Sequence, residues 1–147
     1  MPWVEPIFDR TIMDVATAQN NRESTLPQKG ARNYTDLVRI TGNIYYIRDL
    51  MNQHGISPAA LTSKLNWVLG EVPTYNDILQ IKNDLNKLKT AFSALQISAP
   101  PTPDLPYLSY YKLNDVEEIL FIANRILKGI EEMFIYSGEI YGGELWQ

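Results

Sequence analysis

The residue types that carry catalysis are scarce in this chain. His54 is the only histidine and there is no cysteine, so no second Cys or His can complete a zinc site and no thiolate nucleophile exists. A Ser-His-acid arrangement would have to use His54, and the sequence contains no Gly-x-Ser-x-Gly elbow. His54 precedes Gly55 at a predicted helix end, where a histidine usually acts through its charge on the helix dipole. These residues predict no catalytic group, no cofactor and no metal ligand, and we expect a protein that is not an enzyme.

Carboxylates alone could still hold a cation, so their spacing matters. Asp9 and Asp14, like Glu117 and Glu118, lack the Asp-x-Asn-x-Asp-Gly spacing of a calcium loop. The glycine-rich patterns that cradle phosphates in nucleotide-binding proteins are also absent from the sequence. We therefore expect these acids to cap helices or to lie on solvated helix faces.

Basic residues do not form the footprint of a nucleic-acid-binding protein. The net charge is −4, and the densest basic group alternates with Asn and Asp along one predicted helix: Lys82, Lys87 and Lys89. Residues 114–147 hold seven acids and two bases, so that end carries −5 and the remainder about +1. The charge pattern predicts no nucleic-acid partner, while the acidic end favours solubility and can bias the choice of partner.

Aromatic residues are the informative excess. The chain has nine tyrosines and three tryptophans, and those at its two ends cannot all enter one small core. Tyr and Trp are favoured as interface anchors because they combine a large apolar ring with a polar group. We name seven candidate interface residues: Trp3, Phe8, Tyr110, Tyr111, Ile140, Tyr141 and Trp146. The alternative, in which the ends fold back on the same domain, stays open.

Three long amphipathic helices are predicted to form the scaffold. Counted from Asp36, Asp77 and Asp115, apolar residues follow after four, eight, eleven and fifteen positions, which is the seam of a helix in a bundle. The seam residues are Ile40, Ile44, Ile47 and Met51, then Ile81, Leu85, Leu88 and Phe92, and then Ile119, Ala123, Ile126 and Ile130. The pattern indicates either an internal repeat or three amphipathic helices that align through their common periodicity.

Capping and turn residues predict where the helices begin and end. Thr74 or Asn76 is placed to cap the second long helix and Asn114 the third, and Gly55 is placed to end the first. A short helix is predicted over 12–19, capped by Asp9 or Thr11. Another is predicted over 59–64, because Pro58 suits the first position of a helix.

The chain divides into five parts. Residues 1–10, with Pro2 and Pro6, are predicted to form an extended arm. Residues 11–97 hold helical repeats one and two, 98–106 form a stiff proline-rich connector, and 107–136 form the third helix. Alternating aromatic, β-branched and Gly residues in 137–147 predict a strand or β-like tail. The predicted fold is mainly α: a small bundle of three long helices plus short helices, an extended N-terminal arm and a short β-like C-terminal tail.

Several motifs give the chain a resemblance to known proteins. One is Asp9-Arg10-Thr11-x-x-Asp14-Val15, and a longer one runs from Lys29-Gly30 through Asn33-Tyr34-x-Asp36-Leu37-x-Arg39-Ile40 to Asn43-Ile44-x-Tyr46-Ile47-x-Asp49-Leu50. The unit Pro73-Thr74-Tyr75-Asn76-Asp77-Ile78, the stretch 114–120 and the ending 137–144 are similar to units of the same group. Over roughly residues 3 to 141, the chain resembles structural proteins of phages and prophages of Gram-positive bacteria.

The resemblance implies a structural component of the virion, such as a tail, baseplate or fibre adaptor. Its partners would be other virion proteins and copies of itself, and its location the virion, which is assembled in the host cytoplasm. No stretch reaches the roughly 18 apolar residues of a membrane span, and the N-terminus lacks a secretory signal, so no membrane partner is expected. Two alternatives stay open: a module that binds a surface glycan through exposed tyrosines, and a phage-encoded regulator of a host protein that uses the acidic end.

Overall fold

The structure, a computed structural model, describes residues 3–21, 34–104 and 109–141, the last eleven of these in backbone only. The described residues form five α-helices and no strand, which confirms a mainly α fold. The helices are α1 (Ile12–Asn20), α2 (Tyr34–Gln53), α3 (Tyr75–Ala91), α4 (Ser93–Ser98) and α5 (Tyr110–Tyr141).

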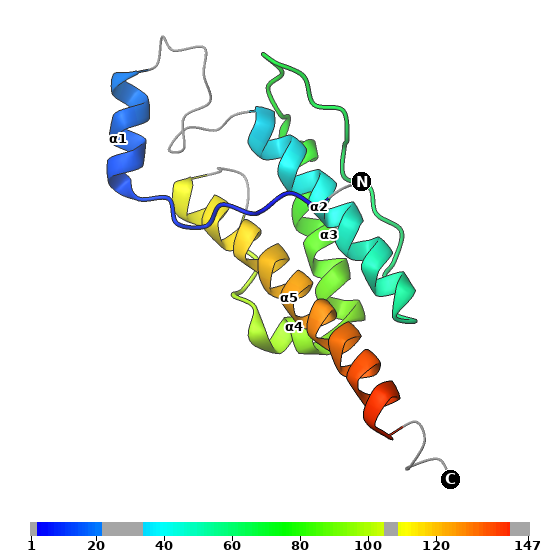
Figure 1. The fold of residues 1–147 in the computed structure, drawn as a ribbon. Coiled ribbons are helices and arrows are strands. Elements are labelled where there is room, and N and C mark those ends of the chain that lie inside the picture. Colours follow the sequence, from blue (N-terminus) through cyan, green and yellow to red (C-terminus); the bar gives the residue numbers. More distant parts are fainter. Residues whose placement is uncertain (1–2, 22–33, 105–108, 142–147) are drawn as a thin grey trace.

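Four of the helices form one bundle, and the N-terminal arm lies across it (Figure 1). α2 packs against α5 and α3, and the short α4 packs against α3 and α5. α1 stands to one side and is joined to the bundle by the arm, while the last turns of α5 extend past the other helices. The long third helix of the prediction therefore packs with the first, and the arm approaches both.

Two helices begin with the same local device. The Thr11 hydroxyl accepts from the Asp14 backbone N–H, and the Asp14 carboxylate accepts from the Thr11 backbone N–H at 2.9 Å. Thr74 and Asp77 repeat this arrangement at the start of α3. These capping boxes pair N–H groups that the first helical turn leaves without partners. The predicted caps Thr11 and Thr74 are confirmed.

The end of α2 is fixed by Gly55, as predicted. Gly55 has a φ of 77°, in the left-handed region that favours glycine. The Ile56 N–H donates to the Met51 carbonyl and the Gly55 N–H to the Asn52 carbonyl. This Schellman ending pairs the last carbonyls of the helix and turns the chain away from α2.

The hydrophobic core confirms the predicted seams of α2 and α3, with Phe92 half-buried at the end of α3. On α5 the prediction is only partly right. Ile119 and Ala123 are buried, but Ile126 and Ile130 are half-buried, and Leu127 takes the place of Ile126. The reason is that α5 faces both α2 and α4, so it buries a wider apolar stripe than a helix with one neighbour.

Two expectations for α5 are wrong. Residues 137–141 continue the helix and do not form a strand; residues 142–147 of the expected β-like tail lie outside the described residues. Extending a helix adds one backbone hydrogen bond per residue, whereas a strand needs a partner strand, and the described residues contain none. Asn114 does not cap the helix, because α5 already begins at Tyr110.

The predicted helix over 59–64 is also wrong, since this segment is not helical. The cause is Asp84 on α3, which is fully buried. Its carboxylate accepts from the Thr62 N–H at 3.1 Å and from the Ser63 N–H at 2.7 Å. The Tyr45 hydroxyl donates to the Ser63 carbonyl at 2.8 Å. Side chains of α2 and α3 thus pair the backbone groups that a helix would have paired internally.

The shifted seam of α5 can be tested with two neighbouring substitutions. We expect Leu127→Ala to lower the free energy of unfolding by about 2–5 kcal/mol, because it empties a fully buried position. Ile126→Ala, at a half-buried position, should cost clearly less. Urea unfolding followed by circular dichroism measures both. A larger loss for Ile126→Ala would restore the register that the sequence repeat predicts.

Candidate functional site

Four charged side chains are buried together where the arm crosses α2 and α5, and we call them the charge cluster. They are Arg10 of the arm, Asp36 and Arg39 of α2, and Glu117 of α5. Arg10 Nη2 lies 2.6 Å from Glu117 Oε2 and 3.3 Å from Asp36 Oδ1. Arg39 Nε lies 2.5 Å from Glu117 Oε1, and Arg39 Nη2 lies 2.6 Å from Asp36 Oδ1. The cluster therefore joins three segments that are far apart in the sequence.

Within these four residues, two arginines face two carboxylates. Glu117 is 0% exposed, Arg10 4% and Asp36 5%. Such burial costs several kcal/mol per ion unless the charges are paired and hydrogen-bonded. Arg39 contacts both oxygens of Glu117, a forked geometry that lysine cannot reproduce. The carboxylates of α2 and α5 thus depend on an arginine from the arm as well as on Arg39.

The protonation of Arg39 follows from its surroundings. Burial by itself lowers the pKa of Arg39, but hydrogen bonds to Glu117 and Asp36 and their negative charges outweigh it, so that its pKa is raised. A guanidinium is protonated at all ordinary pH values even without such help. Arg39 therefore acts as a permanent structural cation and does not exchange protons.

Two asparagines hold the backbone of the arm, and we call them the asparagine clamps. The Asn43 side chain on α2 accepts from the Val4 N–H at 3.1 Å and donates to the Val4 carbonyl at 2.7 Å. The Asn114 side chain on α5 makes the same pair of bonds to Arg10, at 3.1 Å and 2.9 Å. A carboxamide can do this because it carries an acceptor and a donor side by side. The clamps fix an extended chain on a helical surface without a partner strand.

The two arm residues named as interface candidates, Trp3 and Phe8, lie on the protein's own helices. The Trp3 ring packs on Tyr46 of α2 with 5.4 Å between ring centroids, and the Phe8 ring packs on Phe121 of α5 at 4.9 Å. Both are half-buried. For these two residues the structure shows the arm folded back on the same domain, which was the open alternative.

The remaining candidates are placed at the two ends of α5 or beyond it. Tyr110 and Tyr111 begin the helix with their rings edge to face, 5.5 Å between centroids, and Tyr111 is exposed. Ile140 and Tyr141 lie in its last turn, where only the backbone is described, and Trp146 lies outside the described residues. Among the described side chains, the rings of Tyr110 and Tyr111 contact each other, whereas Trp3 contacts Tyr46 and Phe8 contacts Phe121.

A buried lysine ties the proline-rich connector to the bundle. Lys89 of α3 donates from Nζ to the Pro100 carbonyl at 2.6 Å. Burial lowers the pKa of Lys89, which Asp115 of α5 partly opposes, and burial raises the pKa of Asp115, which Lys89 opposes. A lysine with a lowered pKa can serve as a nucleophile or base. Here the ammonium group is buried against a backbone carbonyl, so its role is to hold the connector in place.

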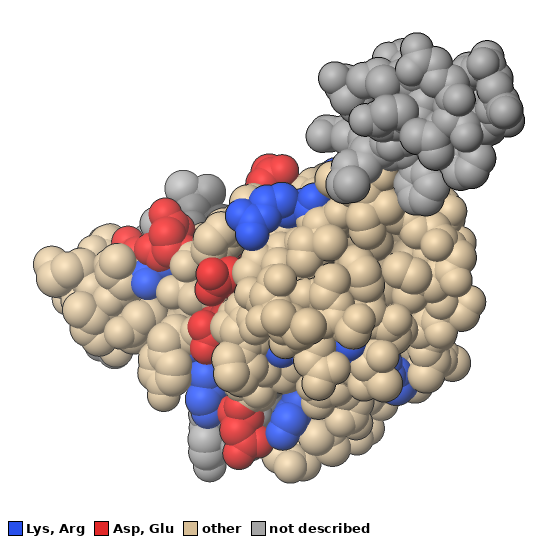
Figure 2. Space-filling view, turned by 90° about the horizontal axis from the view of Figure 1, so that it is seen from below, with Lys and Arg blue, Asp and Glu red and all other residues tan. Residues whose placement is uncertain are grey.

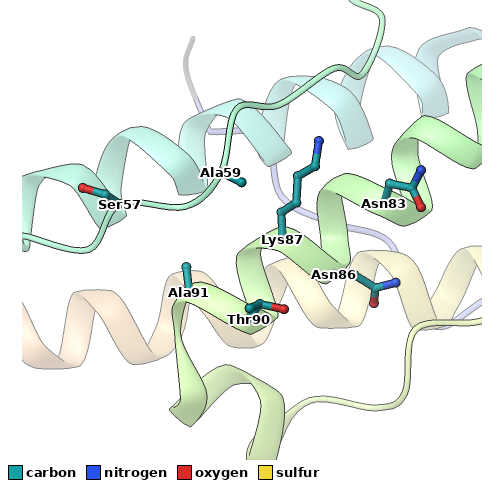
Figure 3. A pocket seen from close by; sticks show the side chains of 7 residues that line it. All are labelled: Ser57, Ala59, Asn83, Asn86, Lys87, Thr90 and Ala91. Carbon is teal, nitrogen blue, oxygen red and sulfur yellow. The ribbon is translucent and has the colours of Figure 1, made fainter.

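Two hollows lie on the described surface. One of about 430 Å³ lies between the segment that follows α2 and the exposed side of α3, and Lys87 reaches across it to donate to the Ala60 carbonyl at 2.7 Å (Figure 3). Another of about 260 Å³ lies between α2 and α5 beside Tyr46 and Lys128. Acidic and basic side chains are interspersed on the face seen in Figure 2, without a patch of one sign. Neither hollow gathers the charged groups of the cluster.

His54 packs α2 onto α5, with Nε2 at 3.0 Å from the Leu127 carbonyl oxygen, an arrangement in which the imidazole N–H donates. It thus has a tertiary contact in addition to the expected place at the end of α2. Among the described residues, no three His, Asp or Glu side chains are grouped so as to hold a metal ion. None of the helices, as far as they are described, is long and apolar enough to cross a membrane.

Comparison of the chain with protein-family models, curated proteins and solved structures finds no match. The motifs quoted from the sequence nevertheless gain a physical meaning from the geometry. Their polar positions Arg10, Asp36, Arg39 and Asn43 meet in or beside the charge cluster. These sequence motifs therefore include residues that hold the arm.

The roles of Glu117, Asn114 and Asn43 were not predicted from the sequence. Glu117 was expected on a solvated face or at a cap, and Asn114 was expected to cap α5. One feature of the sequence could have identified two of them. Glu117 lies four positions after Leu113 and three before Leu120, and Asn43 lies three positions after Ile40 and four before Ile47, so each is on an apolar helix face. A polar residue inside an apolar stripe needs a buried partner, and its partner here comes from the arm.

We expect Asn114→Ala to destabilise the protein by about 1.5–4.5 kcal/mol, because two hydrogen bonds to the Arg10 backbone and one to its guanidinium are lost and each is worth about 0.5–1.5 kcal/mol. Asn83→Ala on the exposed side of α3 is the matched control, since it makes the same change within a helix and should alter stability by no more than about 0.5 kcal/mol. Urea unfolding measures the difference. Equal effects of the two substitutions would show that the clamp contributes nothing.

The fork of Arg39 gives another paired test. We expect Arg39→Lys to cost about 2 kcal/mol, because charge-assisted hydrogen bonds to Glu117 are lost while the charge remains. Arg48→Lys is the control, because Arg48 pairs with the exposed Asp49 at 2.9 Å and a surface ion pair contributes about 0–1 kcal/mol. The midpoints of thermal unfolding report both. If the Arg39→Lys protein were as stable as the wild type, the positive charge alone would account for the contribution of Arg39, and its forked hydrogen bonds would contribute nothing.

Proposed function

We propose that this protein is an assembly component of a phage virion, at the tail, baseplate or a fibre, and that it acts through protein–protein contacts. One observation carries the contact-making part. Four large apolar or aromatic residues within eight consecutive positions are exposed just before and at the start of α3: Val68 (60%), Leu69 (78%), Val72 (81%) and Tyr75 (63%). We call them the apolar turn.

The apolar turn is held in place by its surroundings. Trp67, next to Val68, is buried in the core and donates from its ring N–H to the Lys64 carbonyl at 3.0 Å. Lys64 forms an ion pair with Glu71, and the Glu71 N–H donates to the Val68 carbonyl at 3.1 Å. A protruding apolar segment on a fixed base loses little conformational freedom when a partner covers it. This favours a docking role for the segment.

The virion setting is supported by the sequence motifs. The positions by which the chain resembles phage structural proteins include Arg10, Asp36, Arg39 and Asn43, which hold the arm in this fold. Because the shared positions help to build this fold, the resemblance favours a similar scaffold in this chain and in those phage proteins. A scaffold of this kind, with an arm and a protruding apolar segment, suits a component whose work is to make contacts.

The proposal predicts where the protein is found and what the apolar turn does there. Mass spectrometry of purified particles from a phage that encodes the chain should detect it in constant ratio to the other virion proteins. Leu69→Ser combined with Val72→Ser should leave helicity and stability unchanged, because both side chains are exposed, and should lower incorporation several-fold. Ile97→Ser, at an exposed position on α4, is the matched control. Absence of the wild-type chain from the particles would contradict the virion proposal, and full incorporation of the double variant would remove the apolar turn from it.

A further inference from the structure

The N-terminal arm is bound as a separate peptide would be bound. Its backbone is held at Val4 and Arg10 by side chains of α2 and α5, and its rings pack on the surface of the same two helices. Among the described arm residues 3–10, Arg10 alone enters a buried polar site. These are the contacts of an extended ligand in a groove, and we call the surface that makes them the arm groove.

The bundle does not need the arm to complete its hydrophobic core. Every fully buried member of the main core lies between Leu37 and Leu127, and from the arm only Trp3 packs against it, partly buried. The walls of the arm groove are α2 and α5, which pack on each other directly. The apolar packing between these walls is therefore complete without the arm, whereas Glu117 and Asp36 need an arginine at the position of Arg10 from whichever arm is present.

The chain that connects the arm to α2 is long. It comprises residues 11–33, of which Ile12–Asn20 form α1. With nine of these 23 residues helical, covalent geometry sets an upper bound of about 60 Å on the distance that the segment can span. α1 stands beside the bundle in Figure 1, with Ile12 and Met13 exposed. The arm can therefore reach a neighbouring molecule without any change in the bundle.

We propose that the arm groove takes the arm of a second copy of this chain, so that copies associate by exchanging arms. This deepens the assembly role proposed above and rests on it. The contacts at the clamps, the charge cluster and the two ring pairs are the same whether the arm comes from the same chain or from another. Exchange therefore keeps every contact that the arm makes in the arm groove.

A second copy is the occupant that the geometry favours. The arm groove binds the backbone at Val4 and at Arg10, six residues apart. It also binds the Arg10 side chain and the rings of Trp3 and Phe8. Every copy of the chain presents this combination in one segment, at the same concentration as the groove. Reciprocal exchange closes as a dimer, and exchange in one direction around an axis closes as a ring.

The absence of cysteine allows a direct test with the full-length chain. Phe8→Cys and Phe121→Cys are made in separate chains that carry different tags, because these positions face each other at 4.9 Å between ring centroids. The two proteins are mixed at high concentration and treated with a short bis-maleimide linker. We expect a product joining the two differently tagged chains, in a yield that rises with concentration. Phe8→Cys mixed with Ile97→Cys, an exposed position on α4, should give no more than the background yield.

The chain carrying both Phe8→Cys and Phe121→Cys shows which arm fills the groove. Cross-linking only within the chain, together with a background yield from the mixed single variants, would overturn the proposal and leave the arm as a purely internal strap. If such a protein still associates through the apolar turn, the proposed assembly function stands without arm exchange. Circular dichroism of each variant establishes that it is folded before linking.

A complementation experiment tests the same proposal without cross-links. One variant lacks residues 1–10 but keeps the groove, and the other keeps the arm but carries Asn43→Ala and Asn114→Ala. We expect each alone to be monomeric by light scattering, and their equimolar mixture to form a heterodimer, because the arm of the second can enter the intact groove of the first. A mixture that stays monomeric while the wild type associates would show that the arm does not act between copies.

Discussion

The buried carboxylate of Glu117 is the constraint on which the rest of the structure depends. It lies on α5 at the contact with α2, with no exposed surface, and a buried anion is tolerated only when its charge is paired and its oxygens are hydrogen-bonded. Arg39 supplies part of this from α2, and Arg10 supplies the rest from the arm. The position of one carboxylate thus sets the register of two helices and the path of the arm. Thr11 follows Arg10 directly and caps α1, so the start of α1 is fixed by the same contact.

Helix side chains also form the hydrogen bonds to extended backbone that a neighbouring strand forms in a sheet. Asn43 and Asn114 hold arm residues, and Asp84 holds the N–H groups of Thr62 and Ser63. Asn43 lies seven positions after Asp36, and Asp84 lies seven positions after Asp77. The first two helical repeats therefore share a buried polar residue at one register, and each uses it to hold an extended segment. This common feature favours the internal repeat over a coincidence of periodicity.

The sequence was sufficient for those parts of the fold that depend on local chemistry. The seams of α2 and α3 follow from apolar spacing, and Thr11, Thr74 and Gly55 act through bonds to residues within five positions. The sequence was insufficient where a residue far away in the chain determines the local conformation or the buried face. Asp84 turned a predicted helix into an extended segment, and contact with α4 shifted the buried face of α5. The charge cluster was missed for the same reason, because Arg10 and Glu117 are 107 positions apart and nothing near either residue marks the other as its partner.

The polar character of the arm contacts has a consequence for selectivity. An arm held by Trp3 and Phe8 alone would be bound by apolar area, which discriminates poorly between one aromatic peptide and another. In the charge cluster, a segment without an arginine at the position of Arg10 would leave Glu117 and Asp36 with Arg39 as the only arginine of the cluster, and breaking a buried pair in this way costs about 3–5 kcal/mol. The clamps add a fixed spacing from Val4 to Arg10. The arm groove therefore accepts this arm and rejects most others, which is the property that an exchange between identical copies requires.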